Sequence, residues 1–354
     1  MKYIFKGLKN IINQTGPKAR GLTWQSLKNY TWAFMKIPTR VPLPVEIQLE
    51  PSALCNLRCK MCTLDKDTKG DKFLSRQNLK KLLNDLGQLK TINFTGMGES
   101  LLNKDLEFLI KEAKWSGIET YFITNGQLLS KERANRLIKA GLDKIAISIE
   151  SADPKIYEKI RGGVSFDKLE KNISDLKRVI KKNNAKIKLG FNVVFLKENI
   201  NDLDSIFKII DFAKKFDIDF ISFQNVHDAF MNQTISFFKK DKGLLIRNLF
   251  EIEKYCGQKE IEVSLPSVEM KPNSCYYPWI YPFITASGEL LPCCVIPQFG
   301  AYQKIVEKYS FGNVFTDSFA KVWNGSKAAA FRKTLTRKKP DKHCRRCSKY
   351  LNIL

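Results

Sequence analysis

The stretch "TYFITNGQLLSKERANRLIKAGLDKIAISIE" (residues 120–150) holds two short runs of β-branched and aromatic residues on either side of a helix-like segment. Ser130 can cap the N-terminus of that helix, Glu132 lies in its first turn, and Gly141 ends it. A strand, a capped helix and a second strand predict a right-handed crossover between two parallel strands. We therefore expect this stretch to form one βαβ unit.

The same order of strand, loop and helix recurs along the chain. The predicted strands are residues 45–50, 91–96, 120–124, 144–150, 187–195 and 219–226. Alternating strands and helices predict an α/β fold built on a parallel sheet. Six units are too few to close an eight-stranded barrel. We therefore predict a partial (β/α)6 TIM-like barrel over residues 45–230.

The amino-acid composition and the predicted elements change after this region. Residues 231–270 are predicted to form a connecting helix and a strand, "IEVSL" (261–265). Beyond Pro272 the chain is rich in aromatic residues, cysteine and proline. We predict a small Cys-rich domain over residues 271–354.

Residues 1–44 are predicted to form a helical N-terminal extension. In "MKYIFKGLKNIINQ" (residues 1–14) apolar residues recur at helical spacing between lysines, which is typical of a basic amphipathic helix. Two interpretations stay open. The helix docks on the body of the protein, or it makes peripheral contact with a membrane, helped by Trp24, Trp32 and Phe34.

The composition restricts the class of protein. The 354 residues include 60 Lys and Arg against 36 Asp and Glu, a net charge of +24. The cations are spread along the chain, so we expect no nucleic-acid partner. No apolar run reaches the ~18 residues of a membrane-spanning helix, and the chain does not begin like a signal peptide. We expect a cytoplasmic protein, with contact at a membrane surface as the alternative.

Polar residues and glycines gather where the predicted strands end. In a parallel sheet these ends share one edge, which is where ligands bind. They are "CNLRCKMC" (55–62), "GMGES" (96–100), "TNG" (124–126), Ser148 with Glu150, Asn192 and His227. Each alone is consistent with turn chemistry, but their convergence predicts a ligand site at this edge.

Three cysteines, Cys55, Cys59 and Cys62, follow the first predicted strand with the spacing C-x3-C-x2-C. Structural zinc requires four ligands, and no neighbouring His or Cys supplies the fourth. A [4Fe–4S] cluster held by three cysteines leaves one iron open for a ligand. The motif therefore favours an iron–sulfur cluster with an open position over zinc.

These motifs resemble the signature of the radical S-adenosylmethionine (SAM) enzyme superfamily. Met61 just before the last cysteine, "TGMGES" (95–100), "TNG" and "ISIESADPKIYEKIRGG" (147–163) stand in the order of that family's motifs. The resemblance implies that a [4Fe–4S] cluster on Cys55, Cys59 and Cys62 binds SAM. It also implies that SAM is cleaved to methionine and a 5′-deoxyadenosyl radical.

The resemblance further implies how the loop after the second strand meets SAM. The backbone at Met97 and Gly98 and the region of Glu99 would contact the methionine amino group. Glycine at position 98 permits the close backbone approach that this contact demands. Ser100 stands where the family commonly has proline, which loosens the match at this point.

Four more residues are implied at the SAM site. Ser148 and Asn192 would face the ribose and the carboxylate, and Met61 would face the adenine. Arg161 would reach either the carboxylate or the loop near the first cluster.

A second set of cysteines lies in the last eighty residues. Its members are Cys275, Cys293, Cys344 and Cys347. Four thiolates close either a zinc site or a [4Fe–4S] site. The arrangement resembles the SPASM domain, and more closely its shortened form, Twitch, because the chain ends seven residues after Cys347. That resemblance implies one auxiliary [4Fe–4S] cluster, and the spacing after Gly288 favours Cys293 over Cys294 as a ligand.

We therefore predict a radical SAM enzyme that abstracts a hydrogen atom from a small molecule, with anionic and lipid-like compounds among the candidates. The auxiliary cluster would assist oxidation or bind the substrate, and a flavodoxin or ferredoxin would supply the electron. A peptide substrate is the alternative, because residues 1–44 show no strand-rich module for binding peptide leaders. An alternative from another class is a non-catalytic iron–sulfur carrier or zinc-binding module. Acid–base candidates are Glu150, His227 and Asp228, all near strand ends.

Overall fold

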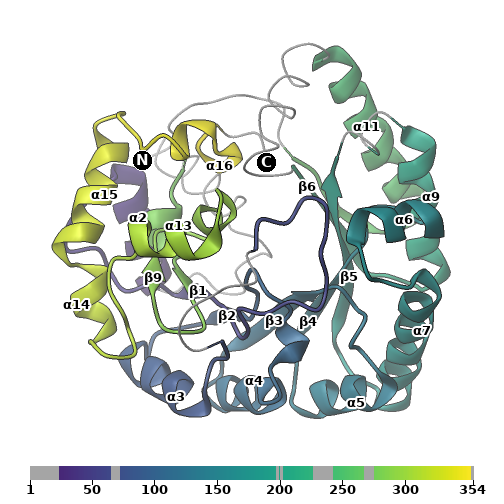
Figure 1. Ribbon diagram of the computed structural model, residues 1–354, viewed down its shortest axis with the longest axis horizontal. Coiled ribbons are helices and arrows are strands. Elements are labelled where there is room, and N and C mark those ends of the chain that lie inside the picture. Colours follow the sequence, from purple (N-terminus) through teal and green to yellow (C-terminus); the bar gives the residue numbers. More distant parts are fainter. Residues whose placement is uncertain are drawn as a thin grey trace.

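The computed structural model describes residues 24–64, 72–196, 199, 202–225, 242–266 and 275–351. Their strands form one sheet in the order β7-β6-β5-β4-β3-β2-β1-β8-β9 (Figure 1). The strands are β1 (Glu46–Leu49), β2 (Thr91–Asn93), β3 (Glu119–Thr124), β4 (Lys144–Ser148), β5 (Lys188–Phe195), β6 (Phe220–Asn225), β7 (Glu262–Ser264), β8 (Phe283–Ile284) and β9 (Leu290–Leu291). Every neighbouring pair is parallel except β8 and β9, which are antiparallel.

Helices connect the strands and cover the outer face of the sheet (Figure 1). They are α3 (Arg76–Asp85), α4 (Leu106–Trp115), α5 (Lys131–Lys139), α6 (Pro154–Arg161), α7 (Phe166–Lys182), α9 (Leu203–Lys215) and α11 (Lys242–Gln258). As predicted, Ser130 caps α5 by accepting a hydrogen bond from the Arg133 amide. Asp153 caps α6, where Pro154 occupies the first turn.

The predicted α/β class and partial barrel are confirmed, but the sheet is longer than six strands. β7 comes from the segment predicted as a connection and pairs with β6. β8 comes from the Cys-rich region, pairs with β1 and continues into β9. The sheet therefore runs without a break from the barrel into the C-terminal region.

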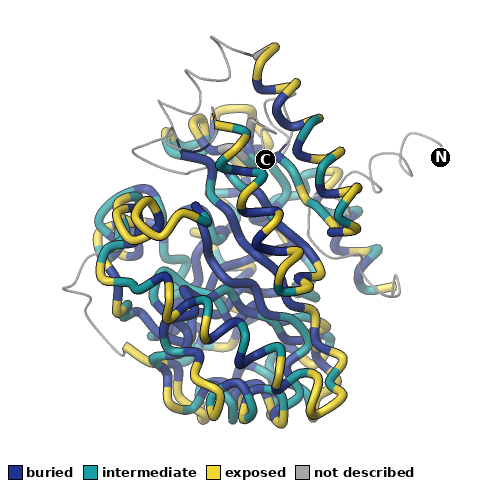
Figure 2. The backbone as a smooth tube through the Cα atoms, turned by 90° about the vertical axis from the view of Figure 1, so that its right-hand side faces the viewer, coloured by how far each residue is buried: buried dark blue, intermediate teal, exposed yellow. Residues whose placement is uncertain are grey.

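The two faces of the sheet differ in chemistry because successive side chains of a strand point to opposite sides. The outer face carries apolar side chains that are completely buried under the helices, such as Ile47, Phe122 and Phe191. The inner face carries uncharged polar groups in the middle of the strands. They include Gln48, Asn93, Thr95, Tyr121, Ser148, Asn192, Ser222 and Gln224. Figure 2 shows the buried residues along the strands and the exposed ones on the surrounding helices.

The C-terminal region adds short helices beside the β1 edge. They are α12 (Tyr277–Ile280), α13 (Tyr302–Tyr309), α14 (Phe319–Trp323), α15 (Ser326–Thr336) and α16 (Ser348–Leu351). α2 (Trp24–Met35) joins them, since the Trp279 indole donates to the Ile37 carbonyl at 2.6 Å. Trp24 on α2 is 73% exposed, and the predicted basic helix over residues 1–14 lies outside the described residues. Among the described helices, none is long and apolar enough to cross a membrane.

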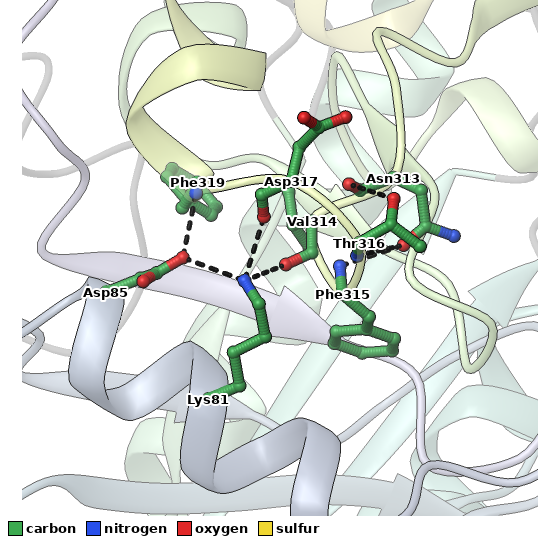
Figure 3. Close-up of polar contacts among 8 residues, drawn as sticks. All are labelled: Lys81, Asp85, Asn313, Val314, Phe315, Thr316, Asp317 and Phe319. Carbon is green, nitrogen blue, oxygen red and sulfur yellow. Dashed lines mark hydrogen bonds and ion pairs between the residues drawn. The ribbon is translucent and has the colours of Figure 1, made fainter.

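A lysine on α3 holds the C-terminal region against the barrel (Figure 3). The Lys81 ammonium donates to the carbonyls of Val314 at 2.9 Å and Asp317 at 2.8 Å, and pairs with Asp85 at 3.2 Å. Asp85 also accepts from the Phe319 amide at 2.8 Å, at the start of α14. One lysine therefore joins a barrel helix to a loop more than two hundred residues away.

Replacing this lysine should weaken the junction. We expect Lys81→Met to lower the free energy of unfolding by about 1–2 kcal/mol, because hydrogen bonds from a charged donor to two carbonyls are lost. Chemical denaturation measures the change. The neighbouring Lys80→Met is a matched control, since the Lys80 ammonium pairs with Glu112 at 3.7 Å and lies 5.5 Å from the centre of the Phe108 ring, both on α4 of the barrel. It should cost less than about 0.5 kcal/mol. Equal losses in the two variants would contradict the assignment.

Candidate active site

The first cysteine loop leaves the end of β1 and is shaped by its own backbone. Cys55 and Cys59 are half-buried and Cys62 is exposed. The amide of Leu57 donates to the Cys55 sulfur at 3.4 Å, and that of Leu64 donates to the Cys62 sulfur at 3.5 Å. Burial raises the pKa of Cys55 to about 12, so a metal that binds this thiol must displace its proton.

The end of α6 supports the cysteine loop from one side. The amide of Lys60 donates to the Ile160 carbonyl at 2.9 Å, and that of Arg58 to the Gly162 carbonyl at 3.4 Å. Gly162 has a φ of +55°, and an added Cβ would lie 2.7 Å from the Arg58 carbonyl oxygen. The "IRGG" sequence therefore allows α6 to end against this loop.

Arg161 connects the loop to a buried carboxylate. Its Nε and Nη2 each donate to Glu150 at 2.5 Å, and its Nη1 lies 3.8 Å from the Cys59 sulfur. Although burial opposes the effect, Glu150 and Cys59 raise the pKa of Arg161. Of the two partners predicted for Arg161, the structure places it at the cysteine loop. Glu150, predicted as an acid–base candidate, is completely buried and engaged in this ion pair.

The "GMGES" loop lies beside the cysteines and uses its glutamate to hold neighbouring elements. The Glu99 carboxylate accepts from the Leu101 amide at 3.0 Å, the Thr124 hydroxyl at 2.7 Å and the Asn125 amide at 2.9 Å. Burial raises the pKa of Glu99, and these donors oppose the rise. The carboxylate is thus committed to the end of β3.

Gly98 lies directly against the backbone that enters the cysteine loop. An added Cβ would be 2.2 Å from the Ser52 carbonyl oxygen and 2.4 Å from that of Leu54. The Glu99 amide also donates to the Leu54 carbonyl at 2.7 Å. The two predicted motifs therefore touch through backbone atoms, and only glycine fits at position 98.

Ser148 and Asn192 lie next to each other, paired in register between β4 and β5. The Asn192 amide oxygen is buried and has no hydrogen-bond partner within the described protein. Buried polar atoms without partners are rare and point to a missing ligand. Met61 packs with Ile160, Leu196 and Val194, which gives the edge an apolar patch. This combination of an orphaned acceptor and an apolar patch fits a nucleoside-like group.

All nine cysteines lie in the described residues and are free thiols. In this part of the chain, no three His, Cys, Asp or Glu side chains converge enough to hold one metal ion. The first set supplies three thiols from one loop, which suits a [4Fe–4S] cluster with one open iron rather than a four-ligand zinc site.

The second cysteine set gathers beside α12 and α16. Burial and then the neighbouring cysteines raise the pKa of Cys293; those neighbours are Cys294, Cys275, Cys347 and Cys344. Burial also raises the pKa of Cys294 to about 12, with Lys349 opposing and Cys347 and Glu46 adding to it. The other three predicted ligands all contribute to the raised pKa of Cys293. For Cys294, the contributing acidic groups include Cys347 and Glu46 of β1.

Three residues of this region were not predicted from the sequence. The hydroxyls of Tyr281 and Tyr121 share a hydrogen bond at 3.0 Å. The Tyr281 hydroxyl also accepts from the side-chain amide of Asn93 at 2.9 Å, so Tyr281 extends the polar network of the inner face. Glu50 and Tyr302 form a buried hydrogen bond at 2.5 Å. The one signal in the sequence for these residues was the position of Glu50, a glutamate directly after a buried strand. His227 and Asp228 lie outside the described residues.

Comparison with known proteins agrees with the motifs. The model of the radical SAM superfamily matches residues 49–210, and that of SPASM, an iron–sulfur cluster-binding domain, matches residues 275–348. The protein named "Probable GTP 3′,8-cyclase" of Sulfolobus acidocaldarius is 30% identical over 238 residues, which are 62% of this chain and 72% of that protein. A PqqA peptide cyclase of Bradyrhizobium diazoefficiens is 25% identical over 322 residues, 85% of this chain and 79% of that protein.

A solved structure shares the fold over nearly the whole chain. The crystal structure of Streptococcus suis SuiB bound to precursor peptide SuiA aligns with a TM-score of 0.66 at 18% identity and covers 99% of this chain and 83% of that one. The named relatives are enzymes, which sets aside a non-catalytic carrier or zinc module. The predicted resemblance is thereby confirmed. This chain belongs to the radical SAM superfamily, whose members bind SAM at a [4Fe–4S] cluster, and it carries a C-terminal SPASM iron–sulfur cluster-binding domain.

Proposed function

We propose that Cys55, Cys59 and Cys62 hold the SAM-binding cluster. The observation that carries this proposal is the contact of Gly98 with the backbone of Ser52 and Leu54, directly before Cys55, which brings the two motifs side by side. When bound and reduced, the cluster supplies the electron that splits SAM into methionine and a 5′-deoxyadenosyl radical. A reductant such as a flavodoxin or ferredoxin would deliver that electron. The chain's net charge of +24 suits an acidic partner of this kind.

Residues along the same edge would orient SAM. The backbone at Met97 and Gly98 would meet the methionine amino group, because the Glu99 carboxylate is committed to other donors. Asn192 would use its unpartnered oxygen to accept a hydrogen bond from a ribose hydroxyl, beside Ser148. Met61 would lie against the adenine. Arg161, oriented by its ion pair with Glu150, would support the cysteine loop by its contact with Cys59.

Cys275, Cys293, Cys344 and Cys347 would hold one auxiliary [4Fe–4S] cluster. The support is the spacing after Gly288, together with the fact that the other three thiols all raise the pKa of Cys293, whereas for Cys294 the contributing one of them is Cys347. Glu46 of β1 contributes to the raised pKa of Cys294, the neighbour of Cys293 in sequence. The auxiliary cluster would stand near a substrate bound on the inner face, where it can accept an electron or bind the substrate.

The substrate would lie on the inner face of the sheet, which offers neutral hydrogen-bonding groups. The amides and hydroxyls of Asn93, Tyr121 and Tyr281 form one network there, which the buried Glu46 carboxyl joins through Tyr121. Burial raises the pKa of Glu46 to about 8, which favours its neutral form. Neutral donors and acceptors suit peptide groups better than phosphate, for which arginine and lysine are the usual partners. A peptide substrate, the alternative in the sequence analysis, thus becomes the first candidate. The match to a PqqA peptide cyclase over 85% of this chain supports it.

A neutral small molecule rich in hydroxyl groups is the second candidate. The same amide and hydroxyl network would bind it. An anionic or lipid-like substrate has in its favour the 30% identity to a protein named as a GTP cyclase, since GTP is anionic, but it has less support from the sheet. On the described inner face, lysines occur toward the starts of the strands, at Lys144 and Lys188, rather than at the end where SAM would bind.

Deuterium transfer distinguishes the substrate candidates. The reconstituted, reduced enzyme is incubated with SAM and a deuterated extract of the source organism, separated into peptide-size and metabolite-size fractions. We expect deuterium in 5′-deoxyadenosine with the peptide fraction, and its loss after protease treatment, because abstraction moves a substrate hydrogen to the radical. Mass spectrometry measures it. Transfer from the metabolite fraction alone would refute the peptide substrate and favour the small molecule.

The ligand assignment at the second site predicts different losses of iron. The reconstituted enzyme should hold about eight irons per chain, four in each cluster. Cys293→Ala should lose about four of them because a four-cysteine site loses a ligand. Cys294→Ala, the matched control, should retain all. Iron and sulfide analysis measures both, and the opposite pattern would make Cys294 the ligand.

Gly98 provides a test of the SAM site itself. Gly98→Ala should lower the rate of 5′-deoxyadenosine formation by about 100-fold, because backbone atoms must shift where SAM is positioned. Gly87→Ala is the matched control, since an added Cβ there meets nothing within 4 Å. That variant should cleave SAM at the wild-type rate. A Gly98→Ala enzyme with wild-type cleavage would disprove the site.

A further inference from the structure

Glu50 is a buried carboxylate that ends β1 and has no role in the function proposed above. It is completely buried, and the groups that donate to it in the described residues are uncharged, namely backbone amides and a tyrosine hydroxyl. A buried ionised carboxylate is costly unless it is paired or hydrogen-bonded. Its hydrogen bonds therefore indicate what it does.

Three donors from three separate elements converge on this carboxylate. The Met97 amide donates to Oε1 at 2.8 Å, from the loop proposed to bind SAM. The Ala286 amide donates to Oε2 at 3.2 Å, from the turn between β8 and β9. The Tyr302 hydroxyl donates to Oε2 at 2.5 Å, from the first residue of α13. One oxygen thus faces the SAM loop and the other faces the C-terminal domain.

Packing leaves this arrangement little freedom. An added Cβ at Gly96 would lie 2.1 Å from the Glu50 Cγ, so the SAM loop rests directly on the side chain. The Glu50 amide donates to the Ile284 carbonyl at 2.9 Å, which fixes its backbone to β8. Burial raises the pKa of Glu50, and the bonds from Tyr302, Met97, Ala286 and the Gly98 backbone oppose the rise. A shift of α13 or of the hairpin would therefore move the acceptor of the Met97 amide.

We propose that Glu50 is a positioning residue that couples the SAM-binding loop to the C-terminal cluster domain, so that SAM affinity depends on the docking of α13. This inference rests on the proposed SAM site. Coupling between two sites is reciprocal in binding free energy. SAM binding must therefore stabilise the contact of Tyr302 with Glu50 by the same factor by which that contact strengthens SAM binding.

Tyr302→Phe tests the coupling because it removes one hydroxyl that does not touch the SAM loop. We expect the SAM dissociation constant of the reconstituted enzyme to rise about fivefold or more. It is measured by the change in the electron paramagnetic resonance spectrum of the reduced cluster as SAM is added. Glu50→Gln should have a larger effect, since an amide has one acceptor oxygen for three donors. Tyr255→Phe is the matched control, because its hydroxyl bonds with Asp211 on α9 and with Lys259, at the other end of the sheet from β1.

Hydrogen exchange supplies a second measurement. In the wild type, SAM should slow amide exchange in residues 283–309, and Tyr302→Phe should reduce that protection. The coupling would be overturned if cluster-loaded Tyr302→Phe and Glu50→Gln both bound SAM with wild-type affinity, whatever their stability. Absence of SAM-induced protection in the wild type would also overturn it. Failure of the wild type to bind or cleave SAM would instead refute the proposed function.

Discussion

The pairing of β1 on both of its sides is the constraint on which the rest of the structure depends. β1 is hydrogen-bonded in parallel to β2 of the barrel and to β8 of the C-terminal region. The first cysteine loop leaves from its end, between these two neighbours. Because all three strands point the same way, the "GMGES" loop, the cysteine loop and the hairpin turn must meet at one edge of the sheet. The contacts among these three loops therefore follow from the parallel pairing of β2, β1 and β8.

This central position explains why the C-terminal region is attached so firmly. The sheet supplies one attachment at β8, and Lys81 of α3 supplies another at Val314 and Asp317. The Trp279 indole fixes α2 at Ile37 on the same side. A cluster held by cysteines from this region would therefore keep a constant distance from the inner face, which electron transfer to or from a substrate requires.

The sequence predicted the parts of this design that are encoded locally. The six barrel strands could be identified because each is a short β-branched or aromatic run bounded by caps and turns, as in residues 120–150. The ligand-binding edge of the sheet could be identified because the polar and cysteine motifs directly follow the predicted strands. The pairing of β8 with β1 could not, since a two-residue strand carries no periodicity. Likewise, the contact of Glu150 with Arg161 and that of Asn93 with Tyr281 depend on which strands are neighbours, and propensities do not encode this.

Glu50 shows why such long-range contacts matter for function. A glutamine or threonine at this position would be cheaper to bury than a carboxylate. Neither would hold two oxygens open to donors from opposite directions. A carboxylate can accept from Met97 on one oxygen and from Ala286 and Tyr302 on the other at the same time. The cost of burying the charge is offset only while all three elements are in place. The free energy of the buried Glu50 carboxylate therefore depends on whether the SAM loop and the C-terminal domain are both docked against it.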